Sequence, residues 1–327
     1  MAYHQTDELR NIIPPNPLFS KDYFEPNSPE RFLPQKEVNA LSKMPDGAVQ
    51  SFMGERMLDT ILINYEGISN ESMMHLTPPD TDGDVGPDHY FQMVNYEFAI
   101  WDKQGNLLYG PASNMTLFSG LGINAQYDCD PIVLYDHLAD RWLISSMAHN
   151  NYVGPNYILI ALSESPDPLG QWYAYAFEFD DYTDYPKFGV WPDGYYMTAN
   201  QFKNNPSLSW AGSCVAVFNR ESMINGQPDP EMVFFDLEPT GWHHFDPINL
   251  LPAELDGEPP PKGTPNFLCY FKDDTWCFDN DFLSIWKCEV NWENIDNSSL
   301  SEMQMLLTEP FDSNYDLDSN YDSMQYI

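Results

Sequence analysis

The chain is poor in positive charge. It carries 14 Lys and Arg residues against 50 Asp and Glu residues, a formal net charge of −36 at pH 7. Nucleic acids and anionic membrane surfaces are both bound through clusters of Lys and Arg. The composition therefore predicts neither nucleic acid nor membrane lipid as a partner. It suits divalent cations or a salty medium, and it also fits a purely solvated acidic surface.

Long apolar runs are also missing. No stretch of about 18 apolar residues occurs, so the sequence predicts no membrane insertion. The first residues, MAYHQTDELRNIIPPNPL, contain neither a basic segment nor an apolar one, and no signal peptide is visible. Two explanations stay open, a cytoplasmic protein and a chain that lacks its leader.

Cysteines are few and odd in number. None of the five forms a Cys-x-x-Cys pair, and no His lies at zinc-ligand spacing from them. Cys269 and Cys277 flank YFKDDTW, so a disulfide across a hairpin is one alternative and buried free thiols are the other. Phosphate-binding loops, dinucleotide fingerprints and nucleophile elbows are absent as well. We therefore expect no organic cofactor.

Helical periodicity is nearly absent between residues 59 and 295. Short runs of β-branched and aromatic residues alternate there with turn signals, as in FGVW-PDG-YYMTAN. Hydrophobic residues make up 43% of the chain and aromatic residues 15%, enough for a substantial core. We predict an all-β fold, a β-propeller-like meander of four-stranded antiparallel blades. At roughly 40–50 residues per blade, it holds about five blades or forms part of a larger ring.

The composition divides the chain into three parts. Residues 1–58 are polar and Pro-rich and predict an extended, irregular N-terminal arm. Residues 59–312 form the predicted propeller-like domain. The motif DSNYD occurs twice, at 312–316 and 318–322, and residues 313–327 are predicted to form an acidic low-complexity tail.

Three long phrases carry a resemblance: PPDTDGDVGPDHYFQMVN, DPIVLYDHLADRWLIS and YPKFGVWPDGYYMTAN. They are similar to phrases in a family of large, mostly uncharacterised secreted proteins of marine and environmental bacteria. The match covers about residues 60–312. Members of this family look like β-propellers, often carry adhesion-type domains and usually continue with more strand-rich sequence. The resemblance implies a secreted, extracellular protein that matches the first half of the family's domain, and it implies no activity.

The first candidate site is an acidic loop, DTDGDVGPD. Asp80, Asp82 and Asp84 follow the D-x-D-x-D pattern of calcium loops, and the carbonyl of Gly86 and the carboxylate of Asp88 extend the ligand set. The sequence predicts a Ca²⁺ site on a propeller, distinct from an EF-hand because the flanks are not helical. Two alternatives remain open: a turn whose carboxylates cap backbone N–H groups, and carboxylates lining the mouth of the ring.

The second candidate is the acidic segment YDCDPIVLYDHLADRW, with Asp128, Asp130, Asp136, Asp140 and Arg141. One interpretation is structural: a hairpin turn capped by Asp and closed by an Arg pair. The other is functional: Asp130 opens an innermost strand and points into the central channel.

The third candidate is catalytic. Asp184 precedes the strand KFGVW just as Asp130 precedes IVLY, and carboxylates at innermost strand starts can act together as acid and base. We therefore single out Asp130 and Asp184 as the catalytic pair if the protein is a glycosidase. Four aromatic residues are candidates for stacking on sugar rings: Trp172, Tyr185, Trp191 and Tyr195. Ordinary acidic loops and packing between blades are the alternative.

These patterns leave three classes of function. The leading hypothesis is a Ca²⁺-stabilised binding or adhesion module that recognises a glycan or a protein, because no complete catalytic set is visible. The alternative is a glycoside hydrolase or lyase. A third possibility is a structural subunit that self-associates or needs a partner chain.

Overall fold

The computed structural model describes residues 1–14, 63–69, 78–123, 127–149, 154–204, 208–239, 246–274, 278–311 and 313. Within these ranges the structure is built of strands, and its one α-helix is α1 (Arg220–Ile224). Short 3-10 turns occur at η1 (Leu9–Asn11), η3 (Asn114–Thr116), η4 (Ser119–Leu121) and η6 (Ile295–Asn297). None of the helices in this part of the chain is long and apolar enough to cross a membrane.

The strands of the described residues form four antiparallel sheets, which we call blades 1 to 4. Blade 1 contains β2 (Asp82–Val85), β3 (His89–Val94), β4 (Glu97–Asp102) and β5 (Leu107–Ser113). Blade 2 contains β6 (Tyr127–Asp136), β7 (Arg141–His149), β8 (Asn156–Ser163) and β9 (Trp172–Phe179). Blade 3 contains β10 (Tyr182–Trp191), β11 (Gly194–Phe202), β12 (Trp210–Phe218) and β13 (Met232–Leu237). Blade 4 contains β14 (Leu251–Pro252), β15 (Asn266–Lys272), β16 (Phe282–Glu289), β17 (Ser299–Leu300) and β18 (Gln304–Leu307).

This architecture confirms the predicted fold class. Consecutive strands pair as neighbours in the first three blades, as a meander requires, and in blade 4 both β17 and β18 pair with β16. The predicted turn at PDG joins β10 to β11, where Trp191 pairs directly with Gly194. Residues 63–69 form no strand.

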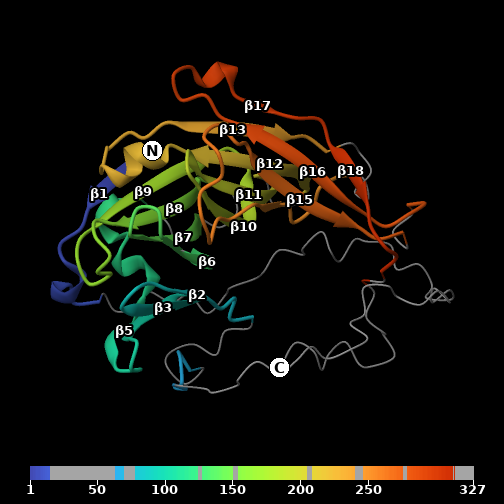
Figure 1. Cartoon of the computed structure of the whole chain (residues 1–327). Coiled ribbons are helices and arrows are strands. Elements are labelled where there is room, and N and C mark those ends of the chain that lie inside the picture. Colours follow the sequence, from blue (N-terminus) through green and yellow to red (C-terminus); the bar gives the residue numbers. More distant parts are fainter. Residues whose placement is uncertain are drawn as a thin grey trace.

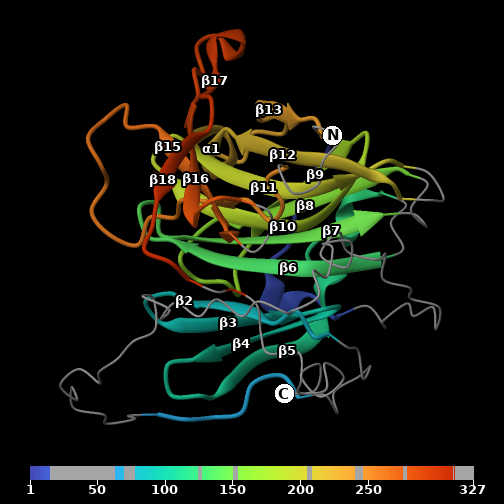
Figure 2. The same ribbon diagram turned by 90° about the vertical axis from the view of Figure 1, so that its right-hand side faces the viewer.

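The first strands of the blades lie next to one another. β6 contacts both β2 and β10, and β10 in turn contacts β14. The blades therefore follow one another in chain order around a common inner side (Figures 1 and 2). The starts of the inner strands are brought together by this arrangement.

Apolar side chains fill the spaces between blades. Phe91 of blade 1 packs near Trp142 and Trp172 of blade 2, with ring centroids 5.8 and 6.0 Å away. Phe188 and Phe218 stack in the core between blades 2 and 3. Burial of each such side chain contributes about 1.5–3 kcal/mol. The blades are thus held together chiefly by apolar packing.

The N-terminal residues join the second sheet. β1 (Ala2–Gln5) pairs with β9 as the outer strand of blade 2, and Leu9 is fully buried against the core of blades 1 and 2. The rest of the predicted arm, from residue 15 to 58, lies outside the described residues, and so does the predicted tail from residue 314.

Thiols in the described residues are unbridged. Cys214 and Cys288 are buried and free, Cys129 is buried, and Cys269 is free and half-buried. Cys277, the predicted alternative partner of Cys269, lies outside the described residues.

Candidate functional site

The inner strands begin with a shared backbone feature. Each inner strand has a residue with a left-handed backbone, either just before the strand or inside its first half. The φ angle is 43° at Asp80, 49° at Asp130, 54° at Tyr185 and 57° at Asn249. In blades 2 and 3 this residue sits in a register shift, between Cys129 and Ile132 and between Asp184 and Lys187. Asp and Asn tolerate this conformation best among residues other than glycine. The four positions are structural equivalents, one in each blade.

Side-chain oxygens link these positions from blade to blade. Asn95 Oδ1 of blade 1 accepts from the Asp130 N–H at 2.9 Å. Asp130 Oδ2 accepts from the Tyr185 N–H at 3.2 Å, and Asn200 Oδ1 of blade 3 accepts from the Asn249 N–H at 3.0 Å. The backbone amide of each left-handed residue in blades 2, 3 and 4 is therefore bound by the preceding blade.

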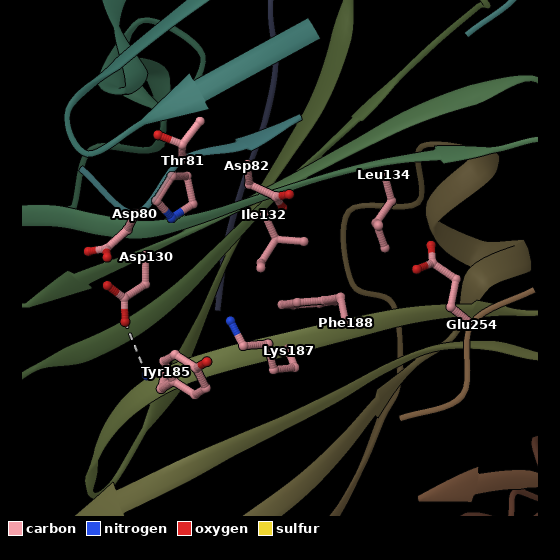
Figure 3. Close-up of a pocket in the computed structure, with 11 residues that line it drawn as sticks. Asp80, Thr81, Asp82, Asp130, Ile132, Leu134, Tyr185, Lys187, Phe188 and Glu254 are labelled. Atoms are coloured by element: carbon pink, nitrogen blue, oxygen red, sulfur yellow. Dashed lines mark hydrogen bonds between the residues drawn. The ribbon is translucent and has the colours of Figure 1, made fainter. Parts of the chain in front are cut away.

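A pocket of about 410 Å³ lies where these strand starts converge (Figure 3). It is lined from all four blades by Asp80, Thr81, Asp82, Asp130, Pro131, Ile132, Leu134, Tyr185, Lys187, Phe188 and Glu254. Acidic groups dominate the polar part of this lining, and Lys187 contributes its one ammonium group. The apolar part is formed by the sides of β6 and β10.

Asp130 is a perturbed acid of the pocket. Burial, followed by the charges of Asp184 and Asp80, raises its pKa well above the ordinary value, against the opposing charge of Lys187 and the Tyr185 N–H bond. Asn95 holds the neighbouring acid as well, because its Nδ2 donates to Asp80 Oδ2 at 2.5 Å. Asp80 and Asp130 are thus fixed through one asparagine.

Lys187 lies among these carboxyl groups. Burial lowers its pKa, and the charges of Asp130, Asp82, Asp80 and Asp184 oppose that shift. The Nζ atom lies 3.7 Å from the centroid of the Tyr185 ring, a cation–π contact that positions the ammonium group.

Glu254 is a second perturbed acid, at the blade 4 side of the pocket. Partial desolvation and then the like charges of Asp256, Asp84 and Asp82 raise its pKa to about 7. Two carboxyl groups with raised pKa values thus line one pocket, and such perturbed acids are typical of acid–base sites.

Two carboxylates of the predicted calcium loop accept hydrogen bonds from the backbone of β6. Asp82 Oδ2 accepts from the Val133 N–H at 2.9 Å, and Asp84 Oδ2 accepts from the Tyr135 N–H at 2.6 Å. Alternate side chains of β2 lie on one face, and alternate N–H groups of β6 point to its free edge, so the two spacings match. These carboxylates tie blade 1 to blade 2.

The other members of the loop are spread out. Gly86 packs so tightly against Trp142 that a Cβ atom would lie 2.6 Å from its ring, and Asp88 is exposed. Among the described residues, the group whose carboxylate oxygens lie within 4.8 Å of one another is Asp273, Asp274 and Asp281, in blade 4. The calcium site at residues 80–88 stays a prediction.

The predicted catalytic pair is brought together in part. Asp130 lines the pocket, whereas Asp184 lies beside it, close enough for its charge to raise the pKa of Asp130. Of the predicted stacking residues, Trp172 and Tyr195 are fully buried and Trp191 is 7% exposed. Tyr185 is 42% exposed and lines the pocket.

In the second acidic segment, Asp136 stabilises the turn between β6 and β7. Asp136 Oδ1 accepts from the N–H groups of Leu138 and Ala139, as the predicted cap requires. Its ion-pair partner is Arg220 of blade 3, at 2.7 Å, while Arg141 donates to backbone carbonyls. Of Asp128 the structure describes the backbone, in β6.

Sequence reasoning missed Lys187, Glu254 and Asn95. One signal was available for Lys187. A proline follows the left-handed residue in both Asp130-Pro131 and Tyr185-Pro186, so aligning these dipeptides places Lys187 at a strand start. Nothing local marks Glu254, which reaches the pocket from the end of β14.

Comparison with known proteins gives distant likenesses. No family model matches, and no curated protein matches. Among solved structures, a GH43_1 enzyme from Xanthomonas citri is 12% identical, with a TM-score of 0.37 over 73% of this chain and 76% of that one. The alpha-L-arabinanase of Penicillium chrysogenum is 11% identical, with a TM-score of 0.37 over 72% of each chain. The GH32 beta-fructofuranosidase of Bombyx mori is 10% identical, with a TM-score of 0.37 over 69% of this chain and 50% of that one. At these scores the likenesses assign neither a family nor an activity.

Proposed function

We propose that the chain is a glycoside hydrolase and that the pocket between the inner strands is its active site. The observation that carries this proposal is the pairing of Asp130, whose pKa is raised well above the ordinary value, with other carboxyl groups in one pocket. A carboxylic acid that keeps its proton can protonate a leaving group, and an ionised neighbour can activate water. An extracellular location, which the family resemblance implies, suits a glycan substrate.

In this proposal Asp130 donates its proton to the glycosidic oxygen as the bond to the sugar carbon breaks. Asp80 accepts a proton from the water molecule whose oxygen bonds to that carbon. The hydrogen bond from Asn95 fixes Asp80 Oδ2 and leaves Oδ1 for the water. Asp184 acts on the reaction through its charge, which helps Asp130 keep its proton.

The test is turnover of a broad panel of oligosaccharides by the purified chain and by Asp130→Asn. Asparagine tolerates the left-handed backbone of position 130, so the variant keeps the fold while it loses the acid. We expect wild-type turnover and a loss of at least about 100-fold in the variant, the usual contribution of a general acid. The matched control is Asp140→Asn, at an exposed turn with φ of 53°. Equal turnover by all three proteins, or none by the wild type, contradicts the proposal.

A second candidate is glycan binding without cleavage. Lys187 favours it, because its charge opposes the shift that keeps Asp130 protonated. A pocket of mixed charge can hold a sugar by hydrogen bonds alone. Saturable binding of an oligosaccharide with no turnover between pH 4 and 9 supports this candidate over hydrolysis.

A further inference from the structure

Lys187 has donors that the protein leaves for a ligand. Within the described residues no carboxylate oxygen lies within 4.0 Å of its Nζ atom, and the ammonium donates no hydrogen bond there. Its close contact is the Tyr185 ring, 3.7 Å away, and in Figure 3 Nζ points from β10 into the pocket. A half-buried ammonium group without an acceptor is costly, so an oxygen atom supplied by a ligand is favoured at this point.

Position 187 differs in charge from the equivalent positions of the other described blades. Lys187 stands two residues after the left-handed Tyr185, and the equivalent residues of the other blades are Asp82, Ile132 and Leu251. The pocket therefore has its ammonium group on one side only. Acidic groups of blades 1 and 2 face it from the other side.

The charges around Lys187 restrict what it can bind. The charges of Asp130, Asp82, Asp80 and Asp184 all act on it, and Glu254 closes the far side of the pocket. A sugar carboxylate would meet Lys187 and also these acids. A sugar ammonium would meet the acids and also Lys187. A hydroxyl group both donates and accepts, so it satisfies both kinds of partner.

We propose that Lys187 is the specificity-determining residue of the pocket and that it selects uncharged sugars with neighbouring hydroxyl groups. Lys187 donates to the oxygen of one hydroxyl, and Asp82 accepts from the next. This inference rests on the proposed function in that it takes a glycan as the ligand. It is independent of whether the glycan is cleaved.

The experiment is binding on a glycan microarray that holds neutral oligosaccharides, oligouronates and amino-sugar oligomers. Wild type is compared with Lys187→Met, which keeps the length of the side chain, and with Lys187→Gln, which keeps a donor. Lys203→Met is the matched control, because Lys203 pairs with Asp181 at the surface. Thermal unfolding of each variant verifies the fold beforehand.

We expect the wild type to bind neutral glycans in preference to both charged classes. Lys187→Met should weaken that binding at least tenfold, Lys187→Gln less, and Lys203→Met not at all. A preference for uronates or amino sugars, or undiminished binding by Lys187→Met, overturns the inference and leaves the proposed function standing. Binding of no glycan by the wild type overturns the proposed function and this inference with it.

Discussion

At the scale of single residues, the surroundings decide what each acid does. Asp84 and Asp130 are both acids of an inner strand. Asp84 accepts the N–H groups of Val85 and Tyr135, both at 2.6 Å, and works as a tether. Asp130 accepts one amide and is partly desolvated among like charges, so its pKa rises. The sequence predicted an acidic cluster at both places, and it could not separate the two roles because neither set of partners is local.

His149 should make the fold sensitive to acid. Burial lowers its pKa to about 4 in the folded chain, from 6.5 when unfolded. Between these two pKa values the unfolded state binds more protons than the folded state. The contribution of neutral His149 to the free energy of unfolding is therefore fully present above pH 6.5 and is lost as the pH drops toward 4, by up to about 3 kcal/mol. We predict that the stability gap between the wild type and His149→Asn narrows over this range in urea unfolding experiments. His137→Asn, at an exposed position, is the control, and a gap that stays constant with pH contradicts the prediction.

At the scale of elements, the sequence predicted the strands and their hairpins, but it did not predict the contacts between blades. Turn signals such as PDG act between neighbours in the chain, so the hairpins of blades 1 to 3 follow from the sequence. The ties between blades join residues that are far apart, 35 positions for Asn95 and Asp130 and 84 for Asp136 and Arg220. Pairs at such separations leave no periodicity to read.

The tie between β2 and β6 can be tested at Asp84. Asp84→Ala removes a charged acceptor of two N–H groups and should cost about 1–3 kcal/mol in the free energy of unfolding. Asp84→Asn keeps one carbonyl oxygen and should cost less. Urea unfolding with Ca²⁺ and with EDTA separates the tie from the predicted calcium site. If the two variants lose stability only when Ca²⁺ is present, the tie is not what these carboxylates supply.

The tie between blades 2 and 3 is a buried ion pair. Asp136 is fully buried and accepts from Arg220 through both oxygens, at 2.7 and 2.8 Å, and from the Tyr195 hydroxyl at 2.8 Å. Arg220→Met leaves that carboxylate uncompensated and should cost about 3–5 kcal/mol. Breaking the exposed pair with Lys203→Met should cost less than about 1 kcal/mol. Equal losses in the two variants, measured by urea unfolding, contradict this account.

At the scale of the whole molecule, the four blades seen in the described residues share an acidic inner side, and the full chain carries a large excess of negative charge. The all-β class was predictable because strand signals recur between residues 59 and 295. The number of blades and the pocket were not, since both depend on how the sheets meet.

Self-repulsion should make the folded chain more stable in salt. With a net charge of −36, screening favours the compact state, and the screening length falls from about 10 Å at 0.1 M salt to about 3 Å at 1 M. We predict that the unfolding midpoint rises by at least about 2 °C in 1 M KCl, the shift that about 1 kcal/mol gives in a chain of this size. Tetramethylammonium chloride should raise the unfolding midpoint by a similar amount. A midpoint that falls, or that rises with KCl alone, contradicts the prediction.

The proposed chemistry depends on one proton, and its most direct test is the titration of Asp130. Carboxyl-carbon NMR of the wild type, with the resonance assigned by its loss in Asp130→Asn, follows that group through the pH range. The account predicts a midpoint well above 3.8, the ordinary value for an aspartic acid, and a further rise in Lys187→Met, because the opposing charge is removed. A midpoint at or below 3.8 would contradict it, because Asp130 would then have no proton to give at neutral pH.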